Sequence, residues 1–273
     1  MIGHRINQLN TPQRHFRFYT LLHDSVPDKV YSHFNKHQGG TMHIFSSFTL
    51  MIIAGTFFSP LVFAKQNTMG IKAGLNLARP WAANSETSIF PHDAGMKPGV
   101  IFGVALRIDG TPIFSMQPEL LFSMKGGVVA RNGNNVEAMT LSYLEIPVLF
   151  RVNIPVERAK PDLYAGPALG LRLSAGGYTR TDNGWDWYTT EYKKTLEEST
   201  NPVDFGLAMG GGLEFPTSSG SVVLDVRYTL GLVKIFRLND YMRMAGWTGD
   251  DLVKDKNGVL SVMVGYNFES KDE

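Results

Sequence analysis

The chain has 273 residues, no cysteine and a formal net charge of +1. Its length fits one or two domains. The missing cysteines exclude disulfides, thiolate metal sites and cysteine nucleophiles, and the charge balance provides no basic face for nucleic acid.

The N-terminal region carries a pattern typical of export. Residues 48–58 form an uncharged, mostly apolar run, followed by Pro60 and the small-residue site Val62-Phe63-Ala64. An apolar core of this length before a small residue is typical of a secretory signal. The uncharged stretch 41–64 is also long enough to be a transmembrane anchor, which stays the alternative.

This pattern divides the chain into three parts, with Met42 as the start of the signal. We expect an upstream extension at residues 1–41, a cleaved signal peptide at 42–64 and a barrel at 65–273. The extension has scattered histidine, arginine and aspartate without a clear period, so it predicts no ordered domain.

After the signal, eight stretches alternate apolar and polar residues. They lie at 69–77, 99–108, 113–125, 141–154, 162–174, 203–215, 221–230 and 259–268. Successive side chains of a strand lie on opposite faces, and segments of about ten residues match a tilted strand that crosses a membrane. The pattern therefore predicts an all-β fold of eight membrane-spanning strands.

The stretch 203–215 shows the alternation most clearly. One face carries Val203, Phe205, Leu207, Met209, Leu213 and Phe215, and the other carries Asp204, Gly206, Ala208, Gly210, Gly212 and Glu214. A soluble lipocalin-like barrel, the structural alternative, would turn its apolar face inward. Because glycine and carboxylate make a poor hydrophobic core, we expect the apolar face to meet lipid.

The connections alternate between long and short. The short ones are 109–112, 155–160 and 216–220, and the long ones are 78–98, 126–140, 175–202 and 231–258. Bacterial outer-membrane barrels keep short turns in the periplasm and long loops outside. We therefore predict an eight-stranded antiparallel up-and-down barrel in the outer membrane, with both termini in the periplasm and the long loops extracellular.

Three prolines lie inside predicted strands, at Pro118, Pro147 and Pro167. Proline cannot donate to a strand ladder, and a closed barrel has no edge where this loss is harmless. We expect bulges or rim positions to accommodate them.

Short motifs recur in order along the predicted barrel. They are Gly70-Ile71-Lys72-Ala73-Gly74-Leu75-Asn76, Gln117-Pro118-Glu119-Leu120, Tyr143-Leu144-Glu145-Ile146-Pro147, Tyr164-Ala165-Gly166-Pro167, Asp204-Phe205-Gly206-Leu207, Asp225-Val226-Arg227-Tyr228 and Gly265-Tyr266-Asn267-Phe268. Together they resemble the PorT-like outer-membrane β-barrel family of Bacteroidetes-type Gram-negative bacteria. The resemblance covers about residues 69–268 and implies an eight-stranded barrel in which strand prolines recur. It does not imply one activity.

The predicted inner faces carry charges of both signs. They are Lys72, Arg107, Glu119, Lys125, Glu145, Arg151, Arg172, Asp204, Glu214, Asp225 and Arg227. An eight-stranded barrel has room inside only for side chains or one small ligand, and buried charges must be paired or wet. These residues therefore form either a structural salt-bridge core or a narrow ion path or ligand pocket.

Catalytic and metal-binding patterns are weak. His92 is the only histidine of the mature region and has no evident catalytic partner. Asp250, Asp251 and Asp255 are close together but lack the EF-hand spacing. The triplet 210–212 lacks the lysine of a phosphate loop. Its inward residues Gly210 and Gly212, like Gly166, Ala168 and Gly170, are expected to make room inside the barrel. We expect no enzyme activity and no cofactor.

Aromatic residues gather in the long connections. The four tryptophans are Trp81, Trp185, Trp187 and Trp247, and the third long connection adds Tyr178, Tyr188 and Tyr192. They fit a recognition surface, an aromatic girdle at the membrane interface, or a packed loop cap.

These features predict a small non-enzymatic outer-membrane barrel with a structural, adhesive or assembly role. Its expected partners are outer-membrane lipid and a protein or glycan at the cell surface, bound by Tyr178, Trp185, Trp187, Tyr188 and Tyr192. The alternatives are a narrow transport or ligand-binding barrel and, less favoured by the missing histidines, a membrane-embedded lipid enzyme.

Overall fold

A computed structural model describes residues 66–82, 90, 95–132, 134–154, 156, 159–181, 183–187, 190–237 and 254–268. The predicted extension and signal segment lie outside these residues, as do His92, Tyr188, Trp247, Asp250 and Asp251. Within the described ranges, no helix has the length and hydropathy to cross a bilayer.

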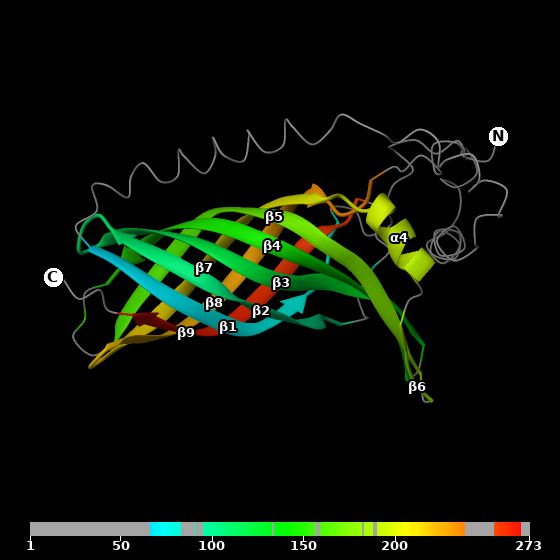
Figure 1. The fold of residues 1–273 in the computed structure, drawn as a ribbon, viewed down its shortest axis with the longest axis horizontal. Coiled ribbons are helices and arrows are strands. Elements are labelled where there is room, and N and C mark those ends of the chain that lie inside the picture. The colour runs from blue at the N-terminus through cyan, green and yellow to red at the C-terminus, as the bar shows by residue number, and fades with distance from the viewer. Residues whose placement is uncertain are drawn as a thin grey trace.

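Eight strands form one closed antiparallel barrel, which confirms the predicted fold (Figure 1). They are β1 (Gln66–Ala78), β2 (Lys97–Asp109), β3 (Phe114–Asn132), β4 (Asn135–Asn153), β5 (Lys160–Thr181), β7 (Val203–Thr217), β8 (Gly220–Lys234) and β9 (Lys256–Phe268). Each strand pairs with the next barrel strand, and the pairing of β1 with β9 closes the circle. A closed ladder leaves no unpaired edge, which a lipid environment requires.

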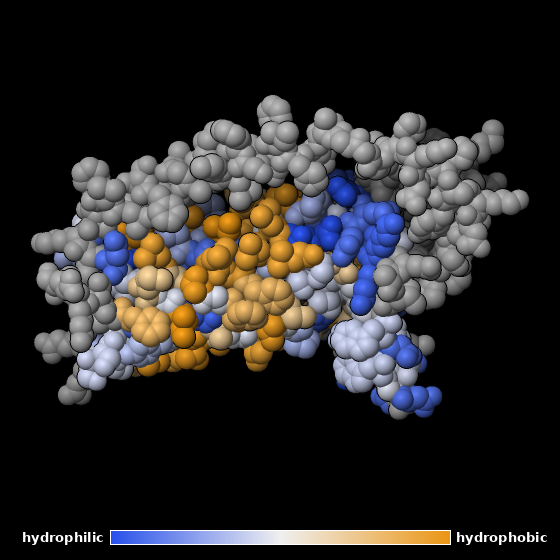
Figure 2. All heavy atoms as spheres, viewed as in Figure 1, coloured by the Kyte–Doolittle hydropathy of each residue, from blue (hydrophilic) through white to orange (hydrophobic). Residues whose placement is uncertain are grey.

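The two faces of the barrel wall differ in polarity as the alternation predicts. Outward side chains are apolar and exposed, as in Leu75 at 61%, Phe150 at 60% and Leu163 at 65%. Figure 2 shows these apolar residues as a band over the middle of the barrel, with hydrophilic residues beyond it. Charged side chains such as Lys72 and Asp225 are buried on the inner face. This orientation is opposite to that of a soluble barrel.

The prediction of a long loop at residues 126–140 is wrong. Strand β3 continues to Asn132 and β4 begins at Asn135, so a tight turn joins them and Asn132 pairs directly with Asn135. The two intervening residues, Gly133-Asn134, are a typical hairpin turn pair. Both strands therefore extend past the apolar band as a hairpin.

The predicted loop 175–202 is also more ordered than expected. Strand β5 continues to Thr181 and pairs with the short strand β6 (Gly184–Trp187), which pairs with no other described strand. Gly184 has a φ of 138°, a backbone conformation that favours glycine. Helix α4 (Thr190–Ser199) follows, and Figure 1 places β6 and α4 at the same end of the barrel.

The three strand prolines lie at gaps in the ladder and not at bulges or on the rim. Pro118 pairs with β4 but is skipped on its β2 side. Likewise, Pro147 is skipped only on its β3 side and Pro167 only on its β4 side. The register keeps the same offset across each gap, so the expectation of bulges is wrong. Each residue of a strand directs its N–H toward one neighbour, so a proline interrupts pairing on one side only.

Candidate functional site: the lumen and the aromatic hairpin

The centre of the lumen holds two cations and two carboxylates from three strands. The Nζ atom of Lys72 lies 3.0 Å from Glu119 Oε1 and 2.7 Å from Asp225 Oδ2. The guanidinium of Arg227 donates to both oxygens of Glu119, at 2.7 and 3.1 Å, and lies 3.7 Å from Asp225. All four side chains are at most 2% exposed. Paired carboxylates and cations thus replace the water that isolated buried charges would need.

A chain of hydrogen bonds extends this central group toward the short-turn end. Gln117 donates to Glu119 at 2.5 Å, and Arg151 donates to Gln117 at 2.8 Å. Arg151 also lies 2.6 Å from Asp162, and both side chains are 3% exposed. The chain therefore carries three cations, Lys72 included, and three carboxylates, Asp225 included, so its formal charge is zero.

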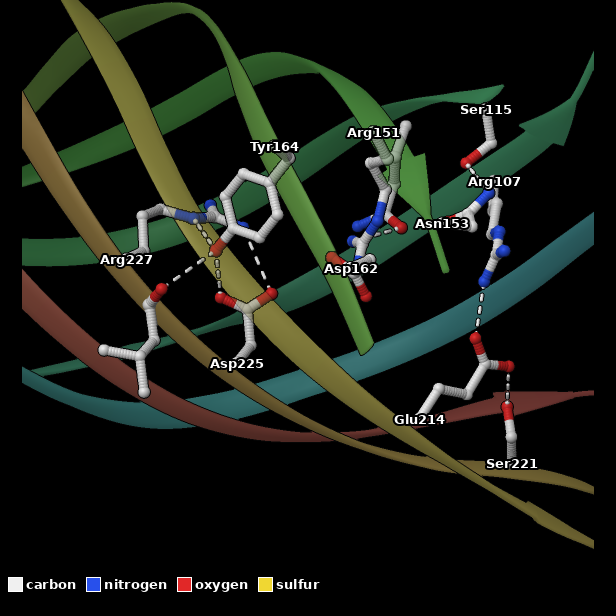
Figure 3. A network of polar contacts seen from close by, with 12 residues as sticks. Arg107, Ser115, Arg151, Asn153, Asp162, Tyr164, Glu214, Ser221, Asp225 and Arg227 are labelled. Atoms are coloured by element: carbon white, nitrogen blue, oxygen red, sulfur yellow. Dashed lines mark hydrogen bonds and ion pairs between the residues drawn. The ribbon is translucent and has the colours of Figure 1, made fainter. Parts of the chain in front are cut away.

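Tyr164 joins the two parts of this chain. Its hydroxyl donates to Asp225, and Arg227 Nε donates to the same hydroxyl at 3.3 Å. The guanidinium carbons of Arg151 and Arg227 lie 5.0 and 5.3 Å from the Tyr164 ring centroid, within cation–π range. Figure 3 shows the Tyr164 and Arg151 groups, followed by a third group around Arg107.

The third group lies near the short turns. Arg107 donates to Asp109 at 2.9 Å and to Glu214 at 2.5 Å, and Ser221 donates to Glu214 at 2.5 Å. The Arg107 side chain is 15% exposed, so this group lies at the rim and not in the sealed interior.

A separate group lies nearer to the loop end. Lys125 is paired with Glu145 and lies 3.0 Å from Asp204, and its Nζ lies 5.0 Å from the Tyr143 ring centroid. Asn257 donates to Asp204 at 2.9 Å. One cation faces two carboxylates here. Asp204 Oδ1 and Asn257 Oδ1 are buried without a hydrogen-bond partner, as are Arg151 Nε and Asp162 Oδ1 in the group nearer to the short turns.

The structure places Arg172 differently from the other predicted interior charges. Its guanidinium donates to the backbone oxygens of Glu197 at 2.8 Å and Asn201 at 3.4 Å. Arg237 donates to the backbone oxygen of Glu198 at 3.1 Å. Cations stabilise the C-terminal end of a helix, so Arg172 anchors α4 against the barrel. A bulge between β4 and β5 leaves its neighbour Leu173 unpaired at this point.

Glycines on β7 make room for the large charged side chains. A Cβ on Gly210 would lie 2.7 Å from the Tyr164 hydroxyl oxygen. A Cβ on Gly212 would lie 2.9 Å from Asp162 Oδ2 and 3.2 Å from Arg151 Nη2. These glycines therefore have a packing role, and side chains that come from β4 and β5 occupy the space.

The aromatic hairpin, defined here as Tyr178, Arg180, Trp185 and Trp187 on β5 and β6, is the second candidate site. The Tyr178 ring centroid lies 4.7 Å from that of Trp185 and 5.5 Å from that of Trp187. Arg180 lies 5.5 Å from the Trp185 ring. Trp185 and Trp187 are 55% and 66% exposed.

Of the other predicted loop aromatics, Tyr192 is a residue of α4, and Trp81 forms an isolated backbone bridge with Lys256 of β9. The aromatic hairpin itself extends beyond the end of the barrel (Figure 1). Its exposed rings are carried by the β5–β6 ladder.

Several members of the lumen groups were missed in the sequence, namely Gln117, Tyr143, Asp162, Tyr164 and Asn257. For the first four, the signal that would have found them is the inner parity that they share with charged residues of the same predicted strands. Asn257 precedes the predicted strand 259–268, so the alternation did not reach it. The described residues include no cluster of three or more His, Asp or Glu that could hold a metal ion.

The sequence matches the family model described as outer membrane protein beta-barrel domain over residues 63–237. A comparison with curated proteins found no match.

Solved structures similar to this chain include Neisserial surface protein A, at 12% identity and a TM-score of 0.37, covering 75% of this chain and 99% of that one. The attachment invasion locus protein Ail of Yersinia pestis is similar at 12% identity and a TM-score of 0.36, covering 74% of this chain and 99% of that one. A second structure of Ail, in complex with the heparin analogue sucrose octasulfate, is similar at 15% identity, a TM-score of 0.36 and the same coverage of both chains.

Proposed function

The chain belongs to the outer membrane protein β-barrel domain family, and from this premise we propose that it is a non-enzymatic barrel that acts through its outer loops. The proposed partner is a protein or glycan at the cell surface. We also propose that it belongs to a PorT-like subgroup of this family, because the PorT-like motifs occur in order along the chain.

The exposure of Trp185 and Trp187 carries this proposal. Both rings are more than half exposed on a short strand outside the barrel ladder, and membrane residence does not require them there. Tryptophan, tyrosine and arginine are the residues most enriched at the energetic centres of binding surfaces. The aromatic hairpin combines all three on one ladder.

The proposed orientation puts the aromatic hairpin outside the cell. The turn after β7 at residues 217–220 is short, whereas β6 and α4 lie at the opposite end of the barrel. Outer-membrane barrels place their short turns in the periplasm. With this orientation both barrel termini are periplasmic.

The contacts in the lumen support a structural role for the interior more than a transport path. The central group balances its charges within itself, and its side chains are almost fully buried. An open path would need water and mobile ions where these pairs now lie.

The proposal is tested with Trp185→Ala and Trp187→Ala combined, in cells that display the protein. Binding to an array of glycans and extracellular proteins should fall at least tenfold, because a truncated aromatic at the centre of a binding surface typically costs about 2 kcal/mol or more. The matched control combines Phe114→Ala and Phe268→Ala, which removes two exposed aromatics at the short-turn end. Equal binding by the tryptophan variant and the wild type would reject this function.

A further inference from the structure

Three lysines gather on the outer surface where β8 and β9 reach the loop end. Lys234 and Lys256 are directly opposite each other in the ladder, and Lys254 precedes Lys256 by two residues. Asp255, between them, is 0% exposed and so lies on the inner side. Successive residues of an extended chain alternate faces, which places Lys254 and Lys256 together on the outside.

The backbone holds this lysine group in place. Ile235 donates its N–H to the Asp255 oxygen at 2.7 Å, which continues the β8–β9 ladder beyond Lys234. The Asn201 side chain donates to the Lys234 oxygen at 2.6 Å. The two cross-strand lysines therefore have little freedom to separate by moving their backbones.

No carboxylate offsets this charge in the part of the chain that the structure describes. The ion pairs of the lumen and its rim include none of Lys234, Lys254 and Lys256. Like charges directly opposite each other in an antiparallel pair are destabilising. An anion from outside the chain would remove this repulsion.

The lysine group lies at the edge of the apolar band. Leu232 and Tyr228 on the same face of β8 are 45% and 41% exposed. Lys234 follows Leu232 by two residues on the same strand, at the register shift between Leu230 and Lys234, and so lies just beyond these apolar side chains. The Lys256 ammonium lies 4.9 Å from the Trp81 ring centroid, and tryptophan beside lysine is typical of the membrane interface.

We propose that Lys234, Lys254 and Lys256 bind the phosphate of a phosphorylated lipid in the outer leaflet. Three ammonium groups that no carboxylate of the described residues pairs favour an anion. Their depth beside exposed apolar side chains favours an anion attached to acyl chains. The inference rests on membrane residence and on the proposed outward orientation of the loops, and it does not involve the aromatic hairpin.

The test uses the full mature chain refolded in neutral detergent micelles. Binding of phosphatidic acid, phosphatidylcholine and inorganic phosphate is measured by isothermal titration calorimetry. Phosphatidic acid should bind at least tenfold more tightly than either of the others. The combined variant Lys234→Gln with Lys256→Gln should lose about 25-fold, because each lysine near an anionic lipid surface contributes about fivefold.

Two control variants distinguish a specific binding site from a general effect of positive charge on lipid binding. The combined variant Lys160→Gln with Lys193→Gln removes the same charge from exposed positions at the opposite rim and on α4, and should bind as the wild type does. The charge-retaining variant Lys234→Arg with Lys256→Arg should bind within about twofold of the wild type. Equal losses in both glutamine variants, or equal binding of phosphatidic acid and phosphatidylcholine, would overturn the proposal. Equally tight inorganic phosphate would make it a free-anion site and overturn the lipid assignment.

Discussion

Loss of the Glu119 charge is expected to destabilise the barrel more than loss of Glu119 and Arg227 together. Glu119 accepts from Lys72 at 3.0 Å, from Arg227 at 2.7 and 3.1 Å, and its side chain is 0% exposed. Glu119→Gln keeps the shape but leaves these two cations to share Asp225. An uncompensated buried charge costs about 3–5 kcal/mol, which is the expected loss in the free energy of unfolding.

The combined variant Glu119→Gln with Arg227→Met restores the balance. Lys72 with Asp225 and Arg151 with Asp162 then remain as two complete pairs. The cost of the double variant should fall below that of either single variant, because no charge is left unpaired. The sum of the two single costs is about 6–10 kcal/mol, so the non-additivity should be large.

Urea unfolding of the protein in lipid vesicles, followed by tryptophan fluorescence, measures these free energies. Glu198→Gln on the exposed side of α4 is the control and should change stability by about 0.5 kcal/mol at most. The reasoning is refuted if the free energy of unfolding of Glu119→Gln stays within about 1 kcal/mol of the wild type, a margin that exceeds the effect of most surface substitutions. It is also refuted if the double variant costs the sum of the two single variants.

Three further predictions concern packing, orientation and processing. Gly212→Ala should lower the unfolding free energy by about 1–3 kcal/mol in the same assay, because its Cβ would lie 2.9 Å from Asp162 Oδ2; an unchanged stability would remove the packing role of this glycine. An epitope inserted next to Trp185 should be reached by antibody on intact cells, and one at Ser218 should not; the reverse labelling would reject the proposed orientation. N-terminal sequencing of protein from membranes should begin at Lys65, whereas a chain that retains residues 42–64 would contradict cleavage.

The apolar alternation was sufficient to predict the barrel. Residues that face lipid are apolar and residues that face the lumen are polar, and the two kinds alternate along each strand. Leu75 and Lys72 on β1 show this directly, with the first exposed and the second buried. The pattern ends where the membrane ends, so it could not show that β3 and β5 continue beyond the apolar band. The turn residues Gly133-Asn134 and Asp182-Asn183 carried that information instead.

The contacts inside the lumen could be predicted only as a shared face. Lys72 reaches Glu119 across 47 residues of sequence and Asp225 across 153, and these distances follow from closure and strand stagger. Parity identifies which side chains point inward, but stagger determines which of them meet. For the same reason Arg172, which has the parity of an interior charge, lies against the end of α4.

Conductance through single barrels in a planar lipid bilayer tests most directly the claim that the lumen is packed and that function lies in the loops. We predict that purified, refolded protein gives no steady conductance above that of the lipid alone, because the ion pairs around Glu119 and Asp225 occupy the interior. A large and steady conductance through single barrels would contradict the packed interior and favour a transport function.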